Sequence, residues 1–200
     1  VKGKTFIAGR IEEELYQKFS ETKVIDLLKR EELTVLNTIS TAEGAIQIAM
    51  EESTKTLHGS KILVMGFGRV SKILSNMLKG IGAEVYCETR TTVNCAWIKA
   101  YGYKPILLDE LDNELNQFDI IINTIPHIIL NKEKLKLLKR DCLIIDIASN
   151  PGGVDRKAAK EIGIKLIWAL SLPGRVAPIT SAEFIKETLE NILKDIKTIS

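Results

Sequence analysis

The chain has 200 residues and a nearly balanced charge, with 28 Lys and Arg against 26 Asp and Glu and a net charge of +2. This length suits one full domain plus part of another, with enough chain to bury a real core. Because the two signs of charge are spread along the chain, we expect no nucleic acid as the main partner.

The apolar runs and the cysteines narrow the class of protein further. No apolar run approaches the roughly 20 residues of a membrane span, and no signal peptide opens the chain. We therefore expect a cytoplasmic protein without a membrane partner. The three cysteines (Cys87, Cys95 and Cys142) lack C-x-x-C spacing. They are predicted to be reduced thiols rather than a disulfide or a metal site.

Residues 1–39 read as a short α/β segment. The pattern predicts a strand at 5–8, a helix at 12–19 and a strand at 23–25, followed by a charged stretch. Such a segment is too small to be stable alone. We interpret it as the remnant of an N-terminal, substrate-side α/β domain. Since the chain opens at Val1, directly before a strand, we expect it to be a piece of a longer protein.

Two S/T-x-x-E sequences of the capping-box type frame the middle of the chain. The first, at 40–43, predicts the start of a connecting helix over 40–57. The second, at 180–183, predicts a C-terminal helix within 177–200 that returns to the first domain. Two helices that bracket a domain in this way indicate a pair of inter-domain connections, with a ligand cleft between the two domains.

Residues 61–71 carry the strongest single pattern. Four apolar residues at 62–65 predict a strand that is buried on both faces. Gly66 and Gly68 then turn the chain into a helix over 69–79 with an apolar stripe. The first glycine permits the turn, and the second lets a pyrophosphate approach the helix N-terminus. Ser71 takes the place of the third glycine. Five residues of this turn are predicted to bind a dinucleotide: Gly66, Phe67, Gly68, Arg69 and Val70.

The strand and helix patterns alternate regularly from residue 58 to residue 176. Strands are predicted at 61–66, 84–89, 104–108, 119–124, 142–147 and 164–168, and helices at 69–79, 93–101, 131–138 and 155–162. Alternation of this kind predicts a doubly wound, six-stranded parallel Rossmann sheet of the α/β class. Residues 58–176 would then form the nucleotide-binding domain.

The end of the second strand of that sheet bears on the choice of cofactor. Arg90, Thr91 and Thr92 follow it directly. An arginine with hydroxyl neighbours suits the 2′-phosphate of NADP, whereas a carboxylate there suits the ribose of NAD. Glu88 is such a carboxylate, but strand alternation directs it away from the side of Cys87 and Thr89. We therefore predict NADP as the cofactor.

The fourth strand ends in polar residues that would lie at the same edge of the sheet. Asn123 and Thr124 are predicted to bond the ribose or the carboxamide, and Pro126 to bend the chain over the nicotinamide. His127 is a possible general acid or base, although a histidine beside a proline turn is more often a local loop residue. The glycine–proline loops at 146–153 and 172–178 would line the cleft, where Arg175 is the nearest extra cation for a carboxylate substrate.

Several of these segments, taken together and in order, carry a family resemblance. They are residues 41–46 (TAEGAI), 57–60 (LHGS), 64–70 (VMGFGRV), 122–126 (INTIP), 146–153 (DIASNPGG) and 172–178 (LPGRVAP). Over residues 3–197 the chain resembles the family of the A subunits of dipicolinate synthase. That family is related to the two-domain formate/glycerate dehydrogenase and alanine dehydrogenase group, and its members have a further N-terminal part.

The resemblance implies an NADP-linked oxidoreductase subunit of the sporulating mother cell. It would act with the flavoprotein-like B subunit of dipicolinate synthase to oxidise a dihydrodipicolinate-type intermediate to dipicolinate. The two carboxylates of such a substrate need cationic or N–H partners. Arg175 and the predicted helix start at 41–44, with Thr41 and Glu43, are the candidates. No catalytic residue is carried over from the family.

Two alternative functions remain open on the sequence. One is a regulatory module that binds NADP without doing chemistry, because the fold alone does not fix the function. The other is an oxidoreductase of the shikimate or alanine dehydrogenase kind. The apolar stripes of the two bracketing helices also favour self-association, so a homo-oligomer is possible.

Overall fold

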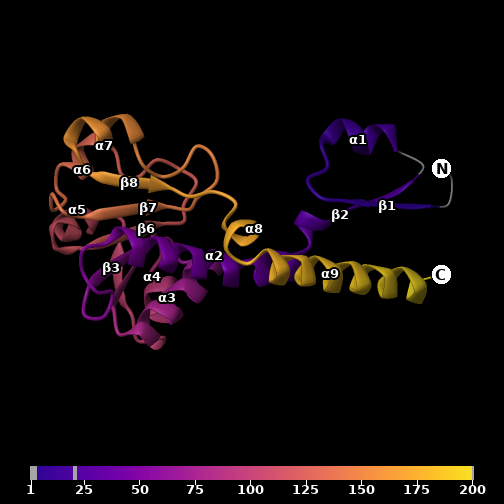
Figure 1. Ribbon diagram of the computed structural model, residues 1–200, viewed down its shortest axis with the longest axis horizontal. Coiled ribbons are helices and arrows are strands. Elements are labelled where there is room, and N and C mark those ends of the chain that lie inside the picture. The colour runs from indigo at the N-terminus through magenta and orange to yellow at the C-terminus, as the bar shows by residue number, and fades with distance from the viewer. Residues whose placement is uncertain (1–3, 20–21, 200) are drawn as a thin grey trace. The chain divides into compact units, whose positions relative to one another are not determined.

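The computed structural model describes residues 4–19 and 22–199 (Figure 1). The chain divides into two compact units. The larger unit is Thr38–Val176, and the smaller unit combines Val1–Asn37 with Ala177–Ser200. Among the described residues, no helix is both long enough and apolar enough to span a bilayer.

The larger unit is built on a sheet of six strands that all run parallel. The strand order is β5-β4-β3-β6-β7-β8, so the direction of winding reverses between β3 and β6. The strands are β3 (Lys61–Met65), β4 (Glu84–Thr89), β5 (Lys104–Leu107), β6 (Ile120–Asn123), β7 (Leu143–Asp146) and β8 (Lys165–Trp168). This arrangement confirms the predicted doubly wound, six-stranded parallel sheet of the Rossmann type.

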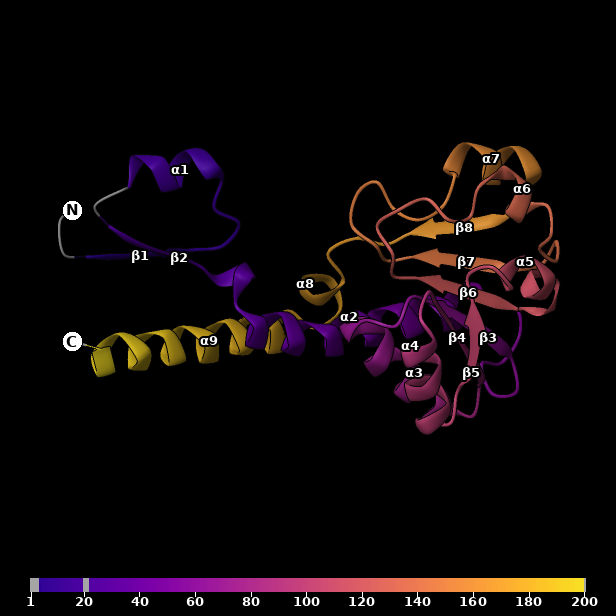
Figure 2. The same cartoon turned by 180° about the vertical axis from the view of Figure 1, so that it is seen from behind.

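Helices cover both faces of this sheet, as Figures 1 and 2 show. One face packs on α2, α3, α4 and α8 through Ala45, Leu74 and Ile98. The other packs on α5, η2, α6 and α7 through Phe118 and Leu135. The bounds are α2 (Glu31–Glu52), α3 (Arg69–Ile81), α4 (Thr92–Ala100), α5 (Leu111–Glu114), η2 (Leu115–Gln117), α6 (Lys132–Leu135), α7 (Arg156–Ile162) and α8 (Leu172–Val176). The helix predicted over 131–138 is thus a single turn.

The smaller unit holds a parallel pair of strands, β1 (Thr5–Ala8) and β2 (Lys23–Asp26), with α1 (Glu13–Lys18), η1 (Leu27–Lys29) and α9 (Pro178–Ile199). Asp26 organises its turn, because its carboxylate accepts from the N–H groups of Ile11, Arg10 and Leu28. These bonds, led by the one from Ile11, lower the pKa of Asp26. The predicted strand–helix–strand order of this segment is therefore present in its described residues.

The two predicted capping boxes are wrong. α2 begins at Glu31, nine residues before Ser40, so the sequence at 40–43 lies inside the helix. α9 begins at Pro178, where the fixed φ of proline suits the first helical position. Glu31 and Glu32 open α2 instead, since carboxylates are favourable in the first turn of a helix. α2 also ends at Glu52 rather than at 57, where Ser53 starts a turn by bonding to Lys55.

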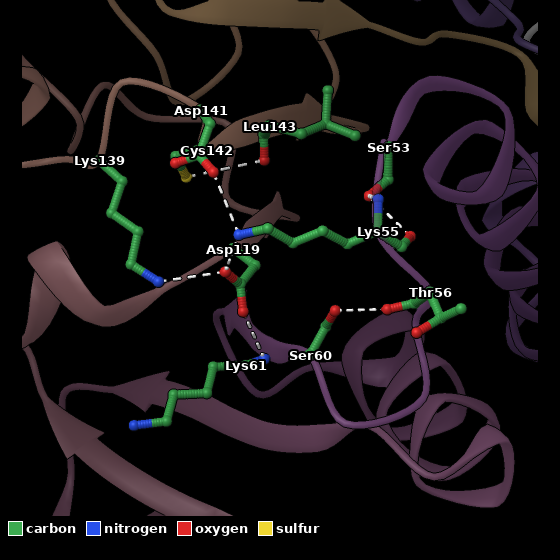
Figure 3. A network of polar contacts seen from close by, with 10 residues as sticks. All are labelled: Ser53, Lys55, Thr56, Ser60, Lys61, Asp119, Lys139, Asp141, Cys142 and Leu143. Carbon is green, nitrogen blue, oxygen red and sulfur yellow. Dashed lines mark hydrogen bonds and ion pairs between the residues drawn. The ribbon is translucent and has the colours of Figure 1, made fainter.

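A network of ion pairs joins three segments at the amino edge of the sheet, where β3 and β6 begin (Figure 3). Asp119 accepts from Lys55 Nζ at 2.9 Å, from Lys139 Nζ at 3.1 Å and from the N–H of Lys61 at 3.0 Å. Lys55 also pairs with Asp141 at 3.1 Å. Both carboxylate oxygens of Asp119 are therefore engaged, and the loop after α2 is tied to the strands.

Candidate functional site

A hollow of about 460 Å³ opens at the opposite, carboxyl edge of the sheet, beside the ends of β3, β4 and β6. The reversal of strand order between β3 and β6 falls at the same place, which is where ligands bind in sheets of this kind. The lining residues are Gly66, Phe67, Glu88, Thr89, Arg90, Thr91, Asn94, Ile125 and His127. The hollow thus gathers predicted residues from three separate segments.

The glycine turn forms one wall of the hollow. Gly66 has φ +89°, and a Cβ there would lie 2.9 Å from Ile125 and Thr124, so only glycine fits. Gly68 caps α3 without a side chain, and a Cβ at that position would meet only open space. The N–H groups of the first turn of α3 make no bond within the helix and carry its positive dipole end. These features fit an approaching phosphate group.

Ser71 and Thr124 hold the turn against the neighbouring strand. Their hydroxyl oxygens lie 2.9 Å apart, and the Thr124 hydroxyl donates to the Met65 carbonyl at 2.8 Å. Ser71 is fully buried, so the serine in place of a third glycine packs helix against strand. Thr124 does not line the hollow and already bonds within the protein.

Arg90 and Thr91, directly after β4, also line the hollow. The Arg90 side chain is exposed and its residue lines the hollow. Thr91 is the N-cap of α4, since its hydroxyl accepts from the Asn94 N–H at 3.2 Å. Thr92 is the first residue of α4, is exposed, and lies outside the lining. A cation and a hydroxyl therefore both lie at the hollow.

Glu88, which the sequence analysis set aside because of strand alternation, also lines the hollow. Alternation does turn it away from Cys87 and Thr89, but its Oε2 accepts from the Gly66 N–H at 3.0 Å. The side chain is fully buried, and its Oε1 has no hydrogen-bond partner within the described part of the chain. Burial raises the pKa of Glu88, against the opposing effects of the Gly66 bond and of Arg90. Glu88 therefore lines the hollow as a buried carboxyl group, and only one of its two oxygens is hydrogen-bonded within the described residues.

The end of β6 contributes less directly than predicted. Asn123 is fully buried, and its amide donates to Asp146 Oδ1 at 2.8 Å and to the Ile125 carbonyl at 3.0 Å. Its own oxygen accepts from the Ile125 N–H. Asn123 thus shapes the loop rather than facing the hollow. Pro126 and His127 are exposed, and of these two His127 lines the hollow.

Asp146 fixes the loop that follows β7. Its carboxylate accepts from Asn123, from the Ala148 N–H at 3.1 Å and from the Gly153 N–H at 2.8 Å. A Cβ at Gly153 would lie 2.3 Å from the Asn123 amide, so glycine is required there. The loops that leave β6 and β7 are consequently joined by buried hydrogen bonds.

The predicted substrate residues are not part of the hollow. Arg175 lies exposed in α8. Thr41 and Glu43 lie in the interior of α2, where backbone N–H groups bond to the preceding turn. The argument that a helix start at 41–44 offers unbonded N–H groups is therefore wrong. Among the described residues, no three His, Cys, Asp or Glu side chains are grouped as a metal site would require.

Comparison with known proteins agrees with this geometry. Residues 30–162 match the family described as "D-isomer specific 2-hydroxyacid dehydrogenase, NAD binding domain". The chain is 36% identical to the A subunit of the dipicolinate synthase of Bacillus subtilis over 178 residues, which are 89% of this chain and 60% of that protein. The chain thus spans less than two thirds of that relative's length.

Two solved structures are similar over nearly the whole chain. A crystal structure of the dipicolinate synthase A chain from Bacillus subtilis matches with a TM-score of 0.92 and 34% identity, covering 97% of this chain and 66% of that one. The corresponding protein from Bacillus halodurans matches with a TM-score of 0.88 and 32% identity, covering 94% and 65%. The resemblance predicted from the motifs is therefore confirmed.

These matches, the parallel sheet and the hollow beside the glycine turn agree on one class of protein. The fold is that of an NAD(P)-binding domain of the dehydrogenases, and the family is one of oxidoreductases. The chain belongs to the family of D-isomer specific 2-hydroxyacid dehydrogenase NAD-binding domains.

Proposed function

We propose that the larger unit binds NADP(H) in the hollow at the carboxyl edge of the sheet. One observation carries the proposal. The hollow is lined both by the glycine turn and by Arg90 with Thr91. The turn and the start of α3 would take the pyrophosphate. Arg90 would take the 2′-phosphate, because a guanidinium forms paired, charge-assisted bonds with phosphate oxygens.

The surroundings of Glu88 support NADP over NAD. A carboxylate that selects NAD accepts bonds from the ribose hydroxyl groups. In this chain one oxygen of Glu88 already accepts from Gly66, and burial favours the protonated form of the group. One oxygen of Glu88 is therefore already engaged within the protein, and exposed Arg90 attracts a 2′-phosphate.

We further propose that the whole protein acts as the A subunit of a dipicolinate synthase in the mother cell of a sporulating bacterium. The similarity to the two Bacillus proteins supports this reading. The reaction would remove two electrons and two hydrogens from a dihydrodipicolinate-type dicarboxylate, which becomes aromatic. NADP⁺ would supply the hydride acceptor, and the second hydrogen would leave as a proton. His127, at the hollow, is the first side chain to test as its acceptor. Arg175 is the cation to test for a substrate carboxylate.

Calorimetry with NADPH and NADH tests the cofactor assignment. Arg90→Ala removes a charge-assisted contact worth about 1.5–3 kcal/mol, so NADPH binding should weaken roughly tenfold or more. NADH binding should stay nearly unchanged. Arg140→Ala is the matched control, because Arg140 is an exposed arginine outside the hollow. Equal losses for both nucleotides would overturn the assignment of Arg90.

An absorbance assay at the nicotinamide band tests the reaction. The protein would be mixed with the B subunit of the synthase, NADP⁺ and dihydrodipicolinate-type, shikimate-type or alanine-type substrates. A change with the first substrate supports a dipicolinate synthase. A change only with another substrate points to the shikimate or alanine dehydrogenase class. Tight NADPH binding without any change would leave the regulatory module as the function.

A further inference from the structure

Helices α3 and α4 lie side by side on one face of the sheet, as both Figures 1 and 2 show. Contacts near their ends join Phe67, before α3, to Tyr101, after α4, and the Lys79 ammonium to the Tyr101 carbonyl at 2.8 Å. The segments 66–83 and 89–103 hold no Asp or Glu at all. They carry five cations: Arg69, Lys72, Lys79, Arg90 and Lys99. A chain of balanced charge therefore concentrates positive charge over these two helices.

An exposed apolar stripe runs along α4 next to α3. Val93, Trp97 and Tyr101 recur every four residues, which places them on one side of the helix. They are 67%, 54% and 47% exposed. The Trp97 and Tyr101 rings stack with centroids 5.9 Å apart. The Tyr101 ring also contacts the Phe67 ring, with centroids 6.2 Å apart. Exposed, adjoining aromatic rings are typical of protein interfaces rather than of ordinary surface.

Lysines of α3 border this stripe. Lys72 Nζ lies 5.4 Å from the centre of the Phe67 ring, and Lys79 Nζ lies 5.6 Å from that of Tyr103. Lys72, Asn76 and Lys79 share one side of α3 by helical spacing, and all three are exposed. The surface defined by Lys72, Asn76, Lys79, Val93, Trp97 and Tyr101 is named the α3–α4 face below. It combines an aromatic centre with a cationic border.

We propose that the α3–α4 face docks a partner protein that presents carboxylates around an apolar pocket. The pocket would receive Trp97, and the carboxylates would pair with Lys72 and Lys79. Complementary charge of this kind steers association and fixes the register of an interface. The identity of the partner rests on the proposed function, in which it is the B subunit of the same synthase.

The chemistry of the face disfavours two other occupants. A two-fold contact between copies of this chain through this face would bring two cationic borders together without any Asp or Glu from the segments 66–83 and 89–103 to pair with them. Single-stranded nucleic acid needs a longer cationic track along its backbone and rings that are open for stacking with bases. Here Trp97 already stacks on Tyr101, and the neighbouring Phe67 and Tyr103 rings are covered by Lys72 and Lys79.

The position of the face connects docking with the cofactor. Phe67 belongs to the glycine turn and lines the hollow, and its ring touches Tyr101. Asn94, in the first turn of α4, also lines the hollow. A partner held on α4 would thus contact residues next to the nucleotide site. Because coupling between two binding sites is reciprocal, NADP(H) should then change the affinity for the partner as the partner changes that for NADP(H).

Biolayer interferometry with the purified B subunit tests the proposal, using the 200-residue chain with and without NADPH. Trp97→Ser and Lys72→Glu should each weaken binding at least about tenfold, and the association rate of the wild type should fall with added salt more than that of Lys72→Glu. Lys136→Glu with Leu137→Ser is the matched control. It removes one exposed lysine and one exposed apolar side chain outside the face, and it should bind as the wild type does.

Three outcomes would overturn the docking surface. In the first, the two variants bind the B subunit as tightly as the wild type does. In the second, the wild type does not bind the B subunit. In the third, Trp97→Ser loses only self-association or oligonucleotide binding. NADPH affinity, measured by calorimetry on each variant, separates this result from the proposed function. Retained NADPH binding by Trp97→Ser also shows that the variant is folded. Failure to bind NADPH by the wild type would reject the cofactor proposal independently of docking.

Discussion

Two carboxyl groups at opposite edges of the same sheet have opposite surroundings. Asp119, at the amino edge, receives three hydrogen bonds, and two of its donors are ammonium groups. Glu88, at the carboxyl edge, receives one bond from Gly66 and keeps a buried oxygen without a partner in the described residues. The pKa values of the two groups differ accordingly. Burial by itself raises that of Asp119, but Lys55, the Lys61 N–H and Lys139 outweigh it and lower the value to about 2. Burial raises that of Glu88.

The difference indicates which edge serves stability and which serves binding. A fully paired carboxylate leaves nothing for a ligand, whereas a buried oxygen without a partner costs free energy and is tolerated more readily at a binding edge than in a purely structural network. The glycine turn lies at the second edge, where a side chain on Gly68 would enter open space. Substitutions at the two edges should therefore separate folding from nucleotide binding.

Gly68→Val is expected to separate nucleotide binding from folding most strongly. A branched side chain would occupy the path of the pyrophosphate to the start of α3, so NADPH affinity should fall at least about 100-fold, or ~3 kcal/mol. The melting temperature should change little, because a Cβ there meets no atom within 4 Å. Gly80→Val places the same side chain in open space farther along α3 and is the control. Normal NADPH binding by Gly68→Val would show that the phosphates lie elsewhere.

Asp119→Asn should give the converse result. Because the folded pKa is depressed, the carboxylate stabilises the fold above its ordinary pKa of 3.8, and this stabilisation is lost as the pH falls toward about 2. The variant should lose about 2 kcal/mol of unfolding free energy at neutral pH, measured by urea denaturation. Its NADPH affinity should match the wild type. A stable variant with weakened NADPH binding would contradict the division between the edges.

Glu88→Gln should have the smallest effect and the opposite pH dependence. Since the folded pKa is raised, the carboxyl group favours the fold most when protonated, and its contribution declines as the pH rises through that pKa. Wild-type stability should therefore fall relative to Glu88→Gln between pH 4 and pH 8. Denaturation at several pH values measures the difference. A gap between the two proteins that does not vary with pH would mean that Glu88 does not titrate in this range.

The sheet and the glycine turn could be predicted because each depends on local sequence. Buried strands such as 62–65 are continuous apolar runs, and Gly66 must be glycine in its own turn. The predicted start of α2 is wrong, because the sequence pattern S-x-x-E is the same at a helix start, where it forms a capping box, and in the interior of a helix. Only the preceding residues, with Glu31 and Glu32 in the first turn, distinguish them.

The site was predicted in part, for a geometric reason. Arg90 and Thr91 follow a strand end, so their place at the edge of the sheet follows from topology. Strand alternation predicts on which face of the sheet Glu88 lies. Near the end of a strand, however, a long side chain can reach the edge of the sheet from either face, as Glu88 does. Asn123 stands at the right edge too, yet its partner Asp146 is 23 residues away and no local pattern pairs them.

The hydrogen bonds of Asp146 also bear on the motion of the loop after β7. The amide hydrogens of Ala148 and Gly153 are buried and bonded to one carboxylate, so they should exchange with solvent slowly despite lying outside regular structure. A loop that is already ordered loses little conformational entropy when a molecule binds beside it. Binding at this edge would then need no closing step from this loop.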